Sequence, residues 1–258
     1  MQFEWPESFE EDYEDYHLPK YLKNMLILSD THIPYHSIRA LDEAVEYGIK
    51  KKVDSILLNG DILDCYTLSK YLVDPTKRKF KEEIEDFKKF IQILQEAFPG
   101  KPIYYKMGNH EERYEKIMID RCPEFLGVKQ FEFGNILGLY EFGVVLIKDQ
   151  KRVYYGKLPI FHGHEVGLKS VAVNPARSLF LKIHACGITS HLHRTSQHTE
   201  PSIESEISCW STGHLGDPHP KFARNNKWNH GCARAVKDEA GDYEVININL
   251  KRNKLFFK

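Results

Sequence analysis

Residues 25–32 read Met-Leu-Ile-Leu-Ser-Asp-Thr-His, an apolar run that leads directly into two side chains able to bind a metal ion. A short uninterrupted apolar run is typical of a buried strand, and Asp30 and His32 follow its carboxyl end. Residues i and i+2 of an extended segment project to the same side. We therefore expect Asp30 and His32 to reach one ion.

The same arrangement, an apolar run followed by ligand-type side chains, recurs along the chain. The further motifs are Gly60-Asp61, Gly108-Asn109-His110-Glu111, His162-Gly163-His164 and His191-Leu192-His193. Taken singly, each has an ordinary explanation, such as a turn at Gly60 or a helix cap at Asn109. Their order and shared context indicate one site where two divalent ions hydrolyse a phosphate ester.

The motifs offer a mixed set of ligand atoms. Asp61 has two carboxylate oxygens and can bridge two cations, and Asn109 offers a neutral carbonyl oxygen. Imidazole nitrogens come from His162, His191 and His193. Such a set suits Mn, Fe, Zn, Co or Ni better than the all-oxygen cages that Ca and Mg prefer. We expect two divalent ions, with Mn²⁺ as the first choice.

Apolar periodicity predicts alternating strands and helices in the first half of the chain. The expected strands are residues 25–28, 53–58 and 102–107, and the expected helices are residues 38–52, 79–98 and 111–120. This alternation is typical of a largely parallel α/β sheet, whose sites lie beyond the carboxyl ends of its strands.

The second half has a different pattern, with turns between short strand-like runs. The expected strands are residues 139–147, 152–161, 187–190, 204–210, 231–237, 243–249 and 254–257, with a helix over 174–182. We expect a second, more antiparallel sheet that packs on the first, with the helices outside.

Composition narrows the class of protein. A chain of 258 residues with 41% hydrophobic residues and a mean hydropathy of -0.49 can bury one substantial core and is typical of soluble globular proteins. The net charge of -1 argues against a long, tightly held nucleic-acid duplex. No apolar run is long enough to span a bilayer, and no signal segment is recognisable at residue 1.

The cysteines and the ends of the chain complete the outline. The five cysteines include no Cys-x-x-Cys pair, which favours reduced thiols and a cytoplasmic location. Residues 1–20 form an acidic and aromatic N-terminal segment, which we expect either to pack on the domain or a partner subunit, or to be a partly ordered leader. Residues 21–258 contain no linker or repeat and are expected to form a single domain. Assembly into a homo-oligomer stays open.

The motif series resembles the signature of the calcineurin-like metallophosphoesterases, over residues 24–194. The resemblance implies a four-layer α/β/β/α sandwich, with two mixed β-sheets flanked by helices and a dinuclear metal site at the carboxyl ends of the strands. Residues 210–214 and 228–231 are similar to the C-terminal part of phosphoesterases carried by bacteriophages and bacteria.

The resemblance also implies roles for individual residues. One ion would be held by Asp30, His32, Asp61 and His193, and the other by Asp61, Asn109, His162 and His191. His110 matches the family histidine that contacts the scissile phosphate and protonates the leaving group. Of the two histidines His162 and His164, the family pattern selects His162, because it directly follows the strand; His164 would lie behind the ligands or face the substrate.

Residues around the motifs are further candidates. Glu111 is expected to orient His110 or another imidazole. Arg113 and Arg194 are candidates for contacting phosphate, with ordinary surface arginines as the competing interpretation. The Gly-Asp motif lacks the Asp-Arg-Gly ending of Ser/Thr protein phosphatases, which weakens that assignment.

Three functions compete for this sequence. The first is a phosphodiesterase or nuclease that acts on nucleotides or short nucleic acid. The second is a phosphomonoesterase that acts on a small metabolite or on protein. The third is a non-catalytic metal-binding module, which the complete motif set argues against. Aromatic and imidazole side chains that could line the opening, or simply pack in the core or a loop, are Tyr35, Tyr66, Tyr71, Trp210, Trp228, His214, His219 and His230.

Overall fold

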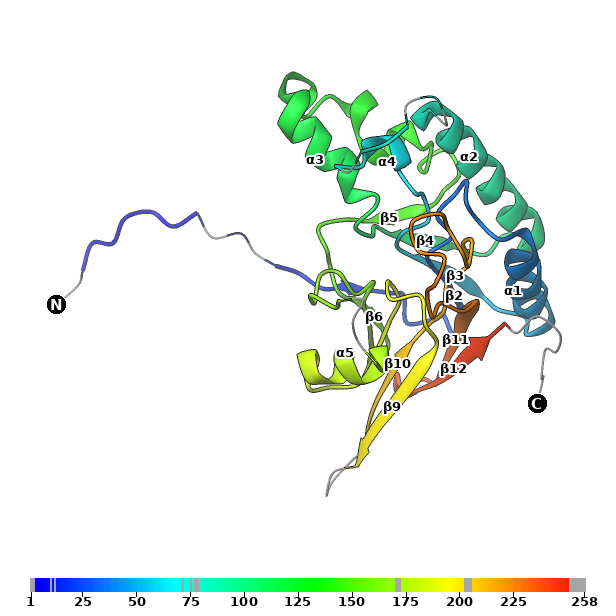
Figure 1. Cartoon of the computed structure of the whole chain (residues 1–258). Helices are drawn as coiled ribbons and strands as arrows, with labels where there is room; N and C mark the ends of the chain where they lie inside the picture. Colours follow the sequence, from blue (N-terminus) through cyan, green and yellow to red (C-terminus); the bar gives the residue numbers. More distant parts are fainter. Residues whose placement is uncertain are drawn as a thin grey trace.

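The computed structural model describes residues 3–9, 11, 13–70, 72–74, 76, 79–169, 173–201 and 206–250. Two mixed sheets of six strands each lie at its centre, and helices flank them (Figure 1). The expected two-sheet sandwich of the α/β class is confirmed. No helix among the described residues is long and apolar enough to cross a membrane.

The first sheet carries the chain's opening motifs. Its strand order is β12-β11-β2-β3-β4-β5, and β2 to β5 run parallel to one another. Met25 pairs with Ser55 and Leu28 with Leu58, so β2 and β3 end side by side. The bounds are β2 Asn24–Leu28, β3 Ser55–Asn59, β4 Ile103–Lys106, β5 Val145–Ile147, β11 Gly231–Lys237 and β12 Tyr243–Asn249.

The second sheet is built mainly from the later part of the chain. Its order is β1-β6-β7-β8-β10-β9, with parallel and antiparallel neighbours. The bounds are β1 Tyr16–His17, β6 Val153–Tyr155, β7 Leu158–Ile160, β8 Gly187–Thr189, β9 Ser196–Pro201 and β10 Glu206–Ser211.

Polar caps fix the ends of two helices. Ser37 accepts a hydrogen bond from the Ala40 amide at the start of α1, and Asn174 accepts one from Arg177 at the start of α5. The helices are α1 Ile38–Lys50, α2 Phe80–Ala97, α3 Glu112–Arg121, α4 Phe133–Ile136 and α5 Pro175–Ile183, with short 3₁₀ turns η1 Tyr66–Leu68, η2 Pro123–Phe125 and η3 Lys129–Phe131.

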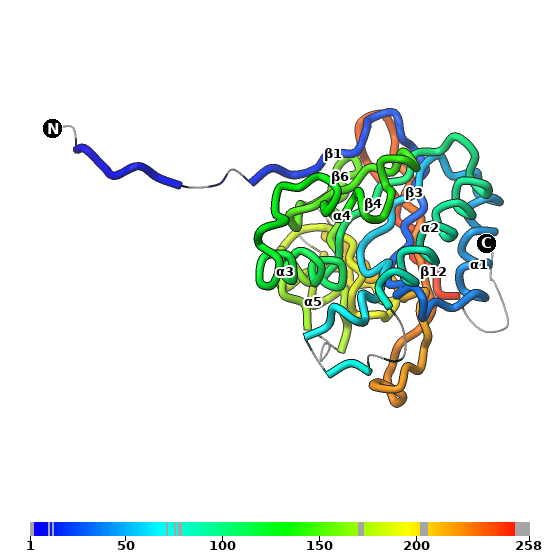
Figure 2. The backbone as a smooth tube through the Cα atoms, turned by 90° about the horizontal axis from the view of Figure 1, so that it is seen from above, coloured from blue at the N-terminus to red at the C-terminus, as the bar shows by residue number. Residues whose placement is uncertain are grey.

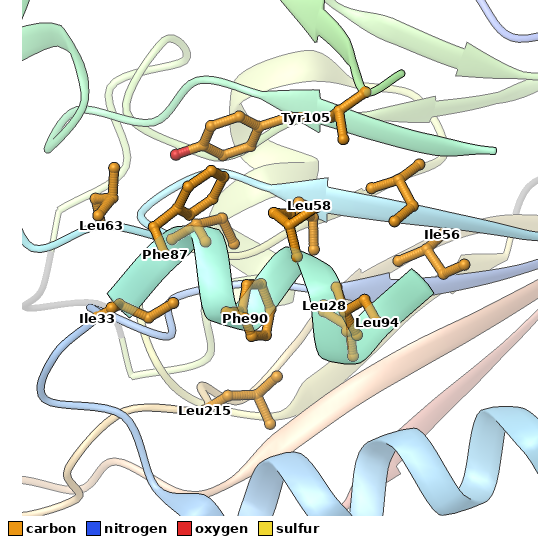
Figure 3. Packing of buried hydrophobic residues seen from close by; sticks show 14 of the residues in the cluster. Leu28, Ile33, Ile56, Leu58, Leu63, Phe87, Phe90, Leu94, Tyr105 and Leu215 are labelled. Carbon is orange, nitrogen blue, oxygen red and sulfur yellow. The ribbon is translucent and has the colours of Figure 1, made fainter. Parts of the chain in front are cut away.

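Three apolar layers hold the sandwich together. The largest lies between the first sheet and α1 and α2, where Leu58, Phe87 and Leu94 are buried (Figure 3). A second cluster, with Ile27 and Ile160, fills the space between the sheets, and a third packs α5 against the second sheet. Successive residues of β2 and β3 alternate between the first two of these clusters, which explains why the central strands are apolar on both faces.

Several expected elements differ from the structure. The strand expected over 139–147 is confined to β5, because residues 139–143 form turns that end at Gly143, with φ 66°. The run 152–161 divides at Gly156, with φ 60°, into the antiparallel strands β6 and β7. Strand β9 was not expected because its residues are polar and lie at a sheet edge. The expected strand 254–257 lies outside the described residues.

The N-terminal segment divides into two parts. Phe3, Trp5 and Phe9 are exposed, and residues 3–9 extend away from the sheets (Figures 1 and 2). By contrast, β1 pairs with β6, and Leu18 is buried. Hydrogen bonding to a sheet edge thus fixes the end of the segment, whereas its first aromatic residues do not pack on the sheets.

Candidate metal centre

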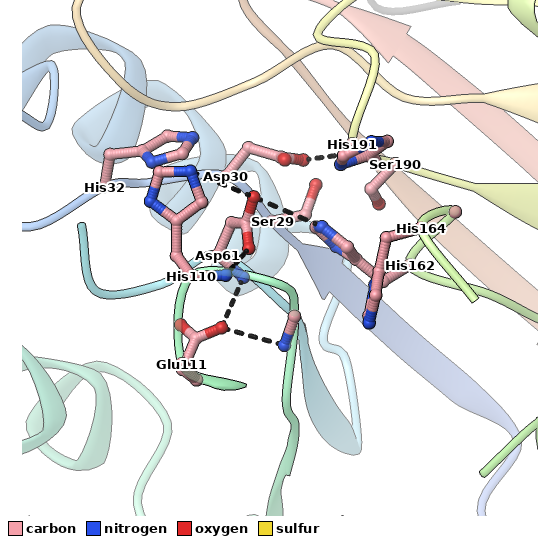
Figure 4. Close-up of polar contacts among 12 residues, drawn as sticks. Ser29, Asp30, His32, Asp61, His110, Glu111, His162, His164, Ser190 and His191 are labelled. Atoms are coloured by element: carbon pink, nitrogen blue, oxygen red, sulfur yellow. Dashed lines mark hydrogen bonds and ion pairs between the residues drawn. The ribbon is translucent and has the colours of Figure 1, made fainter. Parts of the chain in front are cut away.

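The expected ligands converge where the carboxyl ends of strands from both sheets meet (Figure 4). Asp30 and His32 follow β2, and Asp61 follows β3. Asn109 and His110 follow β4 of the same sheet, and the second sheet contributes His162 after β7 and His191 and His193 after β8. Residues more than a hundred positions apart in sequence therefore share one edge of the sandwich.

Asp30, His32 and His193 form the first cluster. His193 Nε2 lies 3.2 Å from Asp30 Oδ1 and 3.2 Å from His32 Nε2. The Nδ1–H of His32 donates to Asp64 Oδ1 at 3.2 Å, which leaves the His32 Nε2 lone pair directed at the cluster. The ligand atoms of the three residues lie within 4.8 Å of one another. One ion can bind all three.

Asp61, His162 and His191 form the second cluster, again within 4.8 Å. His162 Nε2 lies 3.3 Å from Asp61 Oδ2. The Nδ1–H of His162 donates to the Asn59 carbonyl at 2.8 Å, which leaves Nε2 as the nitrogen that can bind an ion once its proton is displaced. A ligand histidine is commonly oriented in this way, with its second ring nitrogen held by a carbonyl.

The unpaired polar atoms of both clusters fit two divalent ions. Burying a polar atom without a hydrogen bond costs about 1–3 kcal/mol. A group of such atoms in one place therefore calls for a partner that the described residues do not supply, and their carboxylate, amide and imidazole chemistry suits a transition-metal pair. Among the described residues, the buried side-chain atoms without a hydrogen bond include Asp30 Oδ1, Asn109 Oδ1, His162 Nε2, His191 Nδ1 and His193 Nδ1.

The backbone at the ligands is strained. Side chains other than glycine rarely adopt a positive φ, and such residues gather at functional sites at a cost of about 1–3 kcal/mol each. Ligand positions in this region are Asp30 (φ 52°), His32 (49°), Asp61 (52°), His191 (65°) and His193 (58°).

Two glycines let the ligand loops approach each other closely. A Cβ atom on Gly60 would lie 2.4 Å from His162 Nδ1. A Cβ atom on Gly108 would lie 2.4 Å from Asp61 Oδ1. Any side chain at either position would therefore displace a candidate metal ligand.

Charges at the centre oppose the effect of burial. Burial raises the pKa of Asp61, but the neighbouring imidazoles of His110 and His162 outweigh it and hold that pKa well below its usual value. Burial also raises the pKa of Asp30, but the imidazoles of His193 and His162 outweigh it and lower that pKa to about 2. Burial lowers the pKa of His162, but the Asp61 carboxylate outweighs burial and raises it to about 10. Burial lowers the pKa of His191 to about 4. Both carboxylates are ionised at neutral pH, and an ion that binds His162 must displace a proton.

His110 stands beside both clusters. Its backbone N–H donates to Asp61 Oδ1 at 3.0 Å, and its Nε2 lies 3.8 Å from Asp61 Oδ2. Its Nδ1–H donates to the Asp64 carbonyl at 2.8 Å, and Arg113 Nη2 donates to its Nε2 at 2.9 Å. The ring edge that carries Nε2 therefore faces the metal centre and an arginine.

Asp64 is a site residue that sequence reasoning missed. Its Oδ1 lies 3.2 Å from His32 Nδ1 and 3.3 Å from His110 Nδ1, so one carboxylate orients both rings. Burial raises its pKa, but hydrogen bonds from the two histidines outweigh burial and lower it far below the usual range. Its position three residues after Asp61 was visible in the sequence, but nothing local indicated that two distant imidazoles would meet it.

The Glu111 carboxylate forms hydrogen bonds with backbone amides rather than with an imidazole. Its carboxylate accepts hydrogen bonds from the amides of Asp61, Ile62 and Leu63 and from Gly108, at 2.7 to 3.0 Å. The Tyr105 hydroxyl donates to it as well, at 2.9 Å. Glu111 was expected to orient an imidazole; it instead fastens the Gly60-Asp61 loop to the loop after β4, because its side chain points back beneath both.

His164 and Arg194 lie away from the cleft. His164 Nε2 donates to Glu112 Oε1 at 2.6 Å, and its Nδ1 is 3.3 Å from Glu165 Oε2, which places it behind the ligand His162. Arg194 is partly buried and does not line the cleft over the metal centre. Arg113, which contacts His110, is the arginine that the structure brings to the centre.

An open cleft of about 460 Å³ lies over the metal centre. Of the rim candidates, Tyr35, Tyr66, Trp228 and His214 line it. Trp210 is buried between the sheets, and His219 is exposed. His230 is buried, with its Nε2–H donating to the Gly216 carbonyl at 2.9 Å. Tyr71 lies outside the described residues. The full lining is His32, Tyr35, Asp61, Asp64, Tyr66, Asn109, His110, His191, His193, His214, Asp217, Pro220, Lys221, Phe222 and Trp228.

Comparison with known proteins assigns this centre to a family. The Gene 54 proteins of Mycobacterium phages L5 and D29 are 24% and 25% identical over 180 and 179 residues, in each case 67% of this chain and 69% of the relative. The E. coli phosphoesterase YfcE aligns with 13% identity and a TM-score of 0.41, over 88% of this chain and all of that chain. A family model described as calcineurin-like phosphoesterase matches residues 23–205. The match spans well over half of the sequence, and the chain belongs to the calcineurin-like phosphoesterases.

Proposed function

We propose that this chain hydrolyses phosphodiesters of nucleotides or short nucleic acid with two Mn²⁺ ions bound at the metal centre. Membership of the family makes the protein a metal-dependent phosphoester hydrolase. The substrate, the metal and the individual residue roles are what we propose. The observation that carries the proposal is the pair of ligand clusters that share the floor of one cleft with His110.

The proposed ligands divide between the two ions as their distances suggest. Asp30, His32 and His193 would hold one ion. His162 and His191 would hold the other, together with Asn109, whose role comes from the family resemblance. Asp61 would contribute to both, since its Oδ2 faces His162 and it also belongs to a group with His32. When bound, the two ions supply an activated water and neutralise charge on the phosphate.

His110 is proposed to donate the proton to the leaving group. The Asp64 carbonyl accepts from Nδ1–H and fixes the ring, so that Nε2 is the atom that faces the cleft. In the structure Arg113 donates to that Nε2. For His110 Nε2 to donate a proton, the Arg113 guanidinium must hydrogen-bond to another acceptor. A phosphate oxygen beside the ring could be that acceptor.

The charges of the cleft favour a diester over a monoester. A diester carries one negative charge at neutral pH, whereas a monoester carries close to two. Beyond the metal ligands the cleft is lined by the carboxylates of Asp64 and Asp217 and by the ammonium of Lys221, together with aromatic rings. Acidic and aromatic walls suit a singly charged phosphate between organic groups better than a compact dianion.

A comparison of synthetic esters tests the proposal. With Mn²⁺ present, we expect bis-p-nitrophenyl phosphate to be cleaved with a higher kcat/KM than p-nitrophenyl phosphate, and chelation of the metal to abolish both activities. A preference for the monoester would contradict the diester assignment and favour a phosphomonoesterase. Two ions bound per chain without any hydrolysis would favour a metal-binding module.

The surroundings of the protein are part of the proposal. All five cysteines are unpaired, which supports a reducing, cytoplasmic location. Assembly into a homo-oligomer stays a prediction, and sedimentation of the purified chain would test it.

A further inference from the structure

Two pairs of aromatic rings line the mouth of the cleft. Phe222 and Trp228 have ring centroids 6.2 Å apart, and Tyr35 and Tyr66 also have centroids 6.2 Å apart. Phe222 is 85% exposed, which is unusual for a phenylalanine and leaves one ring face in water. All four rings border the same cleft as the metal ligands.

The two pairs approach the metal centre through different residues. Trp228 packs edge-on against the proposed ligand His193, with centroids 4.3 Å apart. Tyr66 belongs to the 3₁₀ turn that follows Asp64, the residue that orients His110. The His32 ring lies next to both His193 and His110, with centroids 5.1 Å and 4.6 Å away. Trp228 therefore contacts the centre at His193, whereas the proposed proton donor contacts it at His32 and Asp61.

The loop that carries Phe222 and Trp228 is attached to the site at both ends. The Asp217 amide donates to the Tyr35 carbonyl at 2.7 Å, and the Asn229 amide donates to the His193 carbonyl at 3.0 Å. The loop of residues 217–228, orange in Figure 2, projects from the body of the molecule.

Within the loop, Trp228 is held in place. Its amide donates to Asn226 Oδ1 at 2.7 Å, and the Asn226 side-chain amide donates to the Pro218 carbonyl at 2.7 Å. The Trp228 ring is further supported by His214, with centroids 5.5 Å apart. The phenyl ring of Phe222 is inclined at 64° to this fixed indole, so the two rings offer two separate faces to a flat group rather than one common surface.

We propose that Phe222 and Trp228 form a subsite for the nucleobase of the ester group that stays on phosphorus when the leaving group departs. The inference rests on the proposed function. It adds that the base on the retained ester group is bound, and that Phe222 and Trp228 bind it. A nucleobase on a phosphate ester is a flat ring within reach of the bound phosphate, and stacking removes the exposed face of Phe222 from water. The cleft of about 460 Å³ is of the size that holds a nucleotide.

Every base has a flat face that can stack on an aromatic ring. The subsite therefore favours nucleosides over alkyl groups, without strong preference among the bases. It also requires an unpaired base, since a duplex keeps both base faces covered by its neighbours. Lys221, next to Phe222, places a cation where the rest of a nucleotide chain would pass. The substrate class that fits is a nucleotide ester or a single strand.

The test compares two chromogenic diesters that release the same leaving group. Thymidine 5'-p-nitrophenyl phosphate places a base on the retained side, whereas methyl p-nitrophenyl phosphate places only a methyl group there. Bis-p-nitrophenyl phosphate is unsuitable, because its second ring can itself stack. We expect Phe222→Ala to raise KM for the thymidine ester by about 5-fold or more, which corresponds to the weakest stacking contacts. The KM for the methyl ester should stay unchanged.

Binding without turnover supplies a second readout. In calorimetry with Mn²⁺ present, Phe222→Ala is expected to raise the Kd of thymidine 5'-monophosphate by a similar factor and to leave the Kd of methyl phosphate unchanged. Phe222→Tyr keeps the ring and should restore both values. Phe9→Ala is the matched control, because Phe9 is 89% exposed and lies far from the cleft in the N-terminal segment.

The outcomes separate the subsite from the proposed function. If the wild type cleaves the methyl ester as well as the thymidine ester, or if Phe222→Ala slows both equally, the subsite is wrong while the diesterase stands. If neither diester is cleaved with Mn²⁺, the proposed function itself fails. A gain for the thymidine ester that Phe222→Ala removes and Phe222→Tyr restores supports the subsite.

Discussion

At the scale of single residues, His110 differs from the seven proposed ligands in how it is held. Its ring is fixed by the Asp64 carbonyl on one nitrogen and by Arg113 on the other, whereas His162, His191 and His193 each have a buried ring nitrogen without a hydrogen bond from the described residues. However, His110 also offers a ring nitrogen within 4.8 Å of ligand atoms of His32 and Asp61, close enough for all three to share an ion. The geometry thus allows two roles, and a variant distinguishes them.

We predict that His110→Ala keeps two ions per chain and lowers kcat by about 10²–10⁴-fold, the usual worth of a general acid. Metal content by elemental analysis and turnover of bis-p-nitrophenyl phosphate check the two parts separately. His219→Ala is the control, since His219 is exposed and outside the cleft lining. Loss of one ion in His110→Ala would show that His110 is a ligand instead.

At the scale of elements, α2 meets the loop after β3 through a buried acid. Glu83 of α2 is fully buried, and its Oε1 accepts from the Tyr66 amide at 3.1 Å. Burial raises its pKa, the nearby Asp64 carboxylate raises it further, and the value is about 7. Burial and the Asp64 charge outweigh the hydrogen bonds from the turn, which lower the pKa, so the folded protein favours the protonated form of Glu83.

This gives a prediction for stability against pH. Because the pKa of Glu83 is higher in the folded protein than its ordinary value of 4.5, the folded state binds an extra proton between pH 4.5 and about 7. The stabilisation from that proton is present at low pH and is lost as pH rises through 7. Glu83→Gln should raise the free energy of unfolding at pH 8 by about 1–3 kcal/mol, with a gain that shrinks towards pH 5.

Denaturant unfolding at several pH values measures the effect. Glu85→Gln is the matched control on the same helix, because the Glu85 side chain is 57% exposed. An equal gain at pH 5 and pH 8 would refute the assignment of the proton to Glu83.

At the scale of the whole molecule, a buried ion pair joins the two sheets behind the metal centre. Lys106 Nζ of β4 lies 3.2 Å from Glu165 Oε1, and the side chains are 1% and 6% exposed. Glu165 also accepts from the amides of His162 and Gly163, at 2.8 and 2.7 Å. The pair thus connects the loop of His162, a proposed ligand that follows a strand of the second sheet, to the first sheet.

We predict that Lys106→Met lowers the free energy of unfolding by about 3–5 kcal/mol, because it leaves the Glu165 charge buried without its partner. Adding Glu165→Gln should recover part of the loss. The exposed pair Lys157–Asp242 is the control, and its removal should cost less than about 1 kcal/mol. Additive effects of Lys106→Met and Glu165→Gln in a double-mutant cycle would contradict the coupling.

Metal binding is predicted to stabilise the whole fold and to release protons. His162 has a pKa of about 10 in the metal-free protein, so it carries a proton at pH 7 that a bound ion must displace. Metal affinity should therefore rise with pH over this range, and chelation should lower Tm. Calorimetry in buffers of different ionisation enthalpy measures the release of about one proton at pH 7, and no release would contradict the role of His162.

The sequence by itself determined the central strands, most helices and the residues at the strand ends. Apolar runs such as residues 25–28 encode burial locally, and a parallel strand necessarily delivers the next residues to one edge of its sheet. Asp30, Asp61 and His162 could therefore be predicted to converge before any contact was known. Which residues would act as ligands was predicted from the motifs and from their resemblance to a family.

Only the tertiary structure decided the partners of those residues. The clamp of Glu111 on the Asp61 loop, the pairing of Lys106 with Glu165 and the place of Phe222 over the cleft join segments 50 or more positions apart. The strained φ values of the ligands likewise arise where loops from two sheets meet. Local periodicity records which face of an element is buried, but it holds no information about which distant side chain will lie against that face.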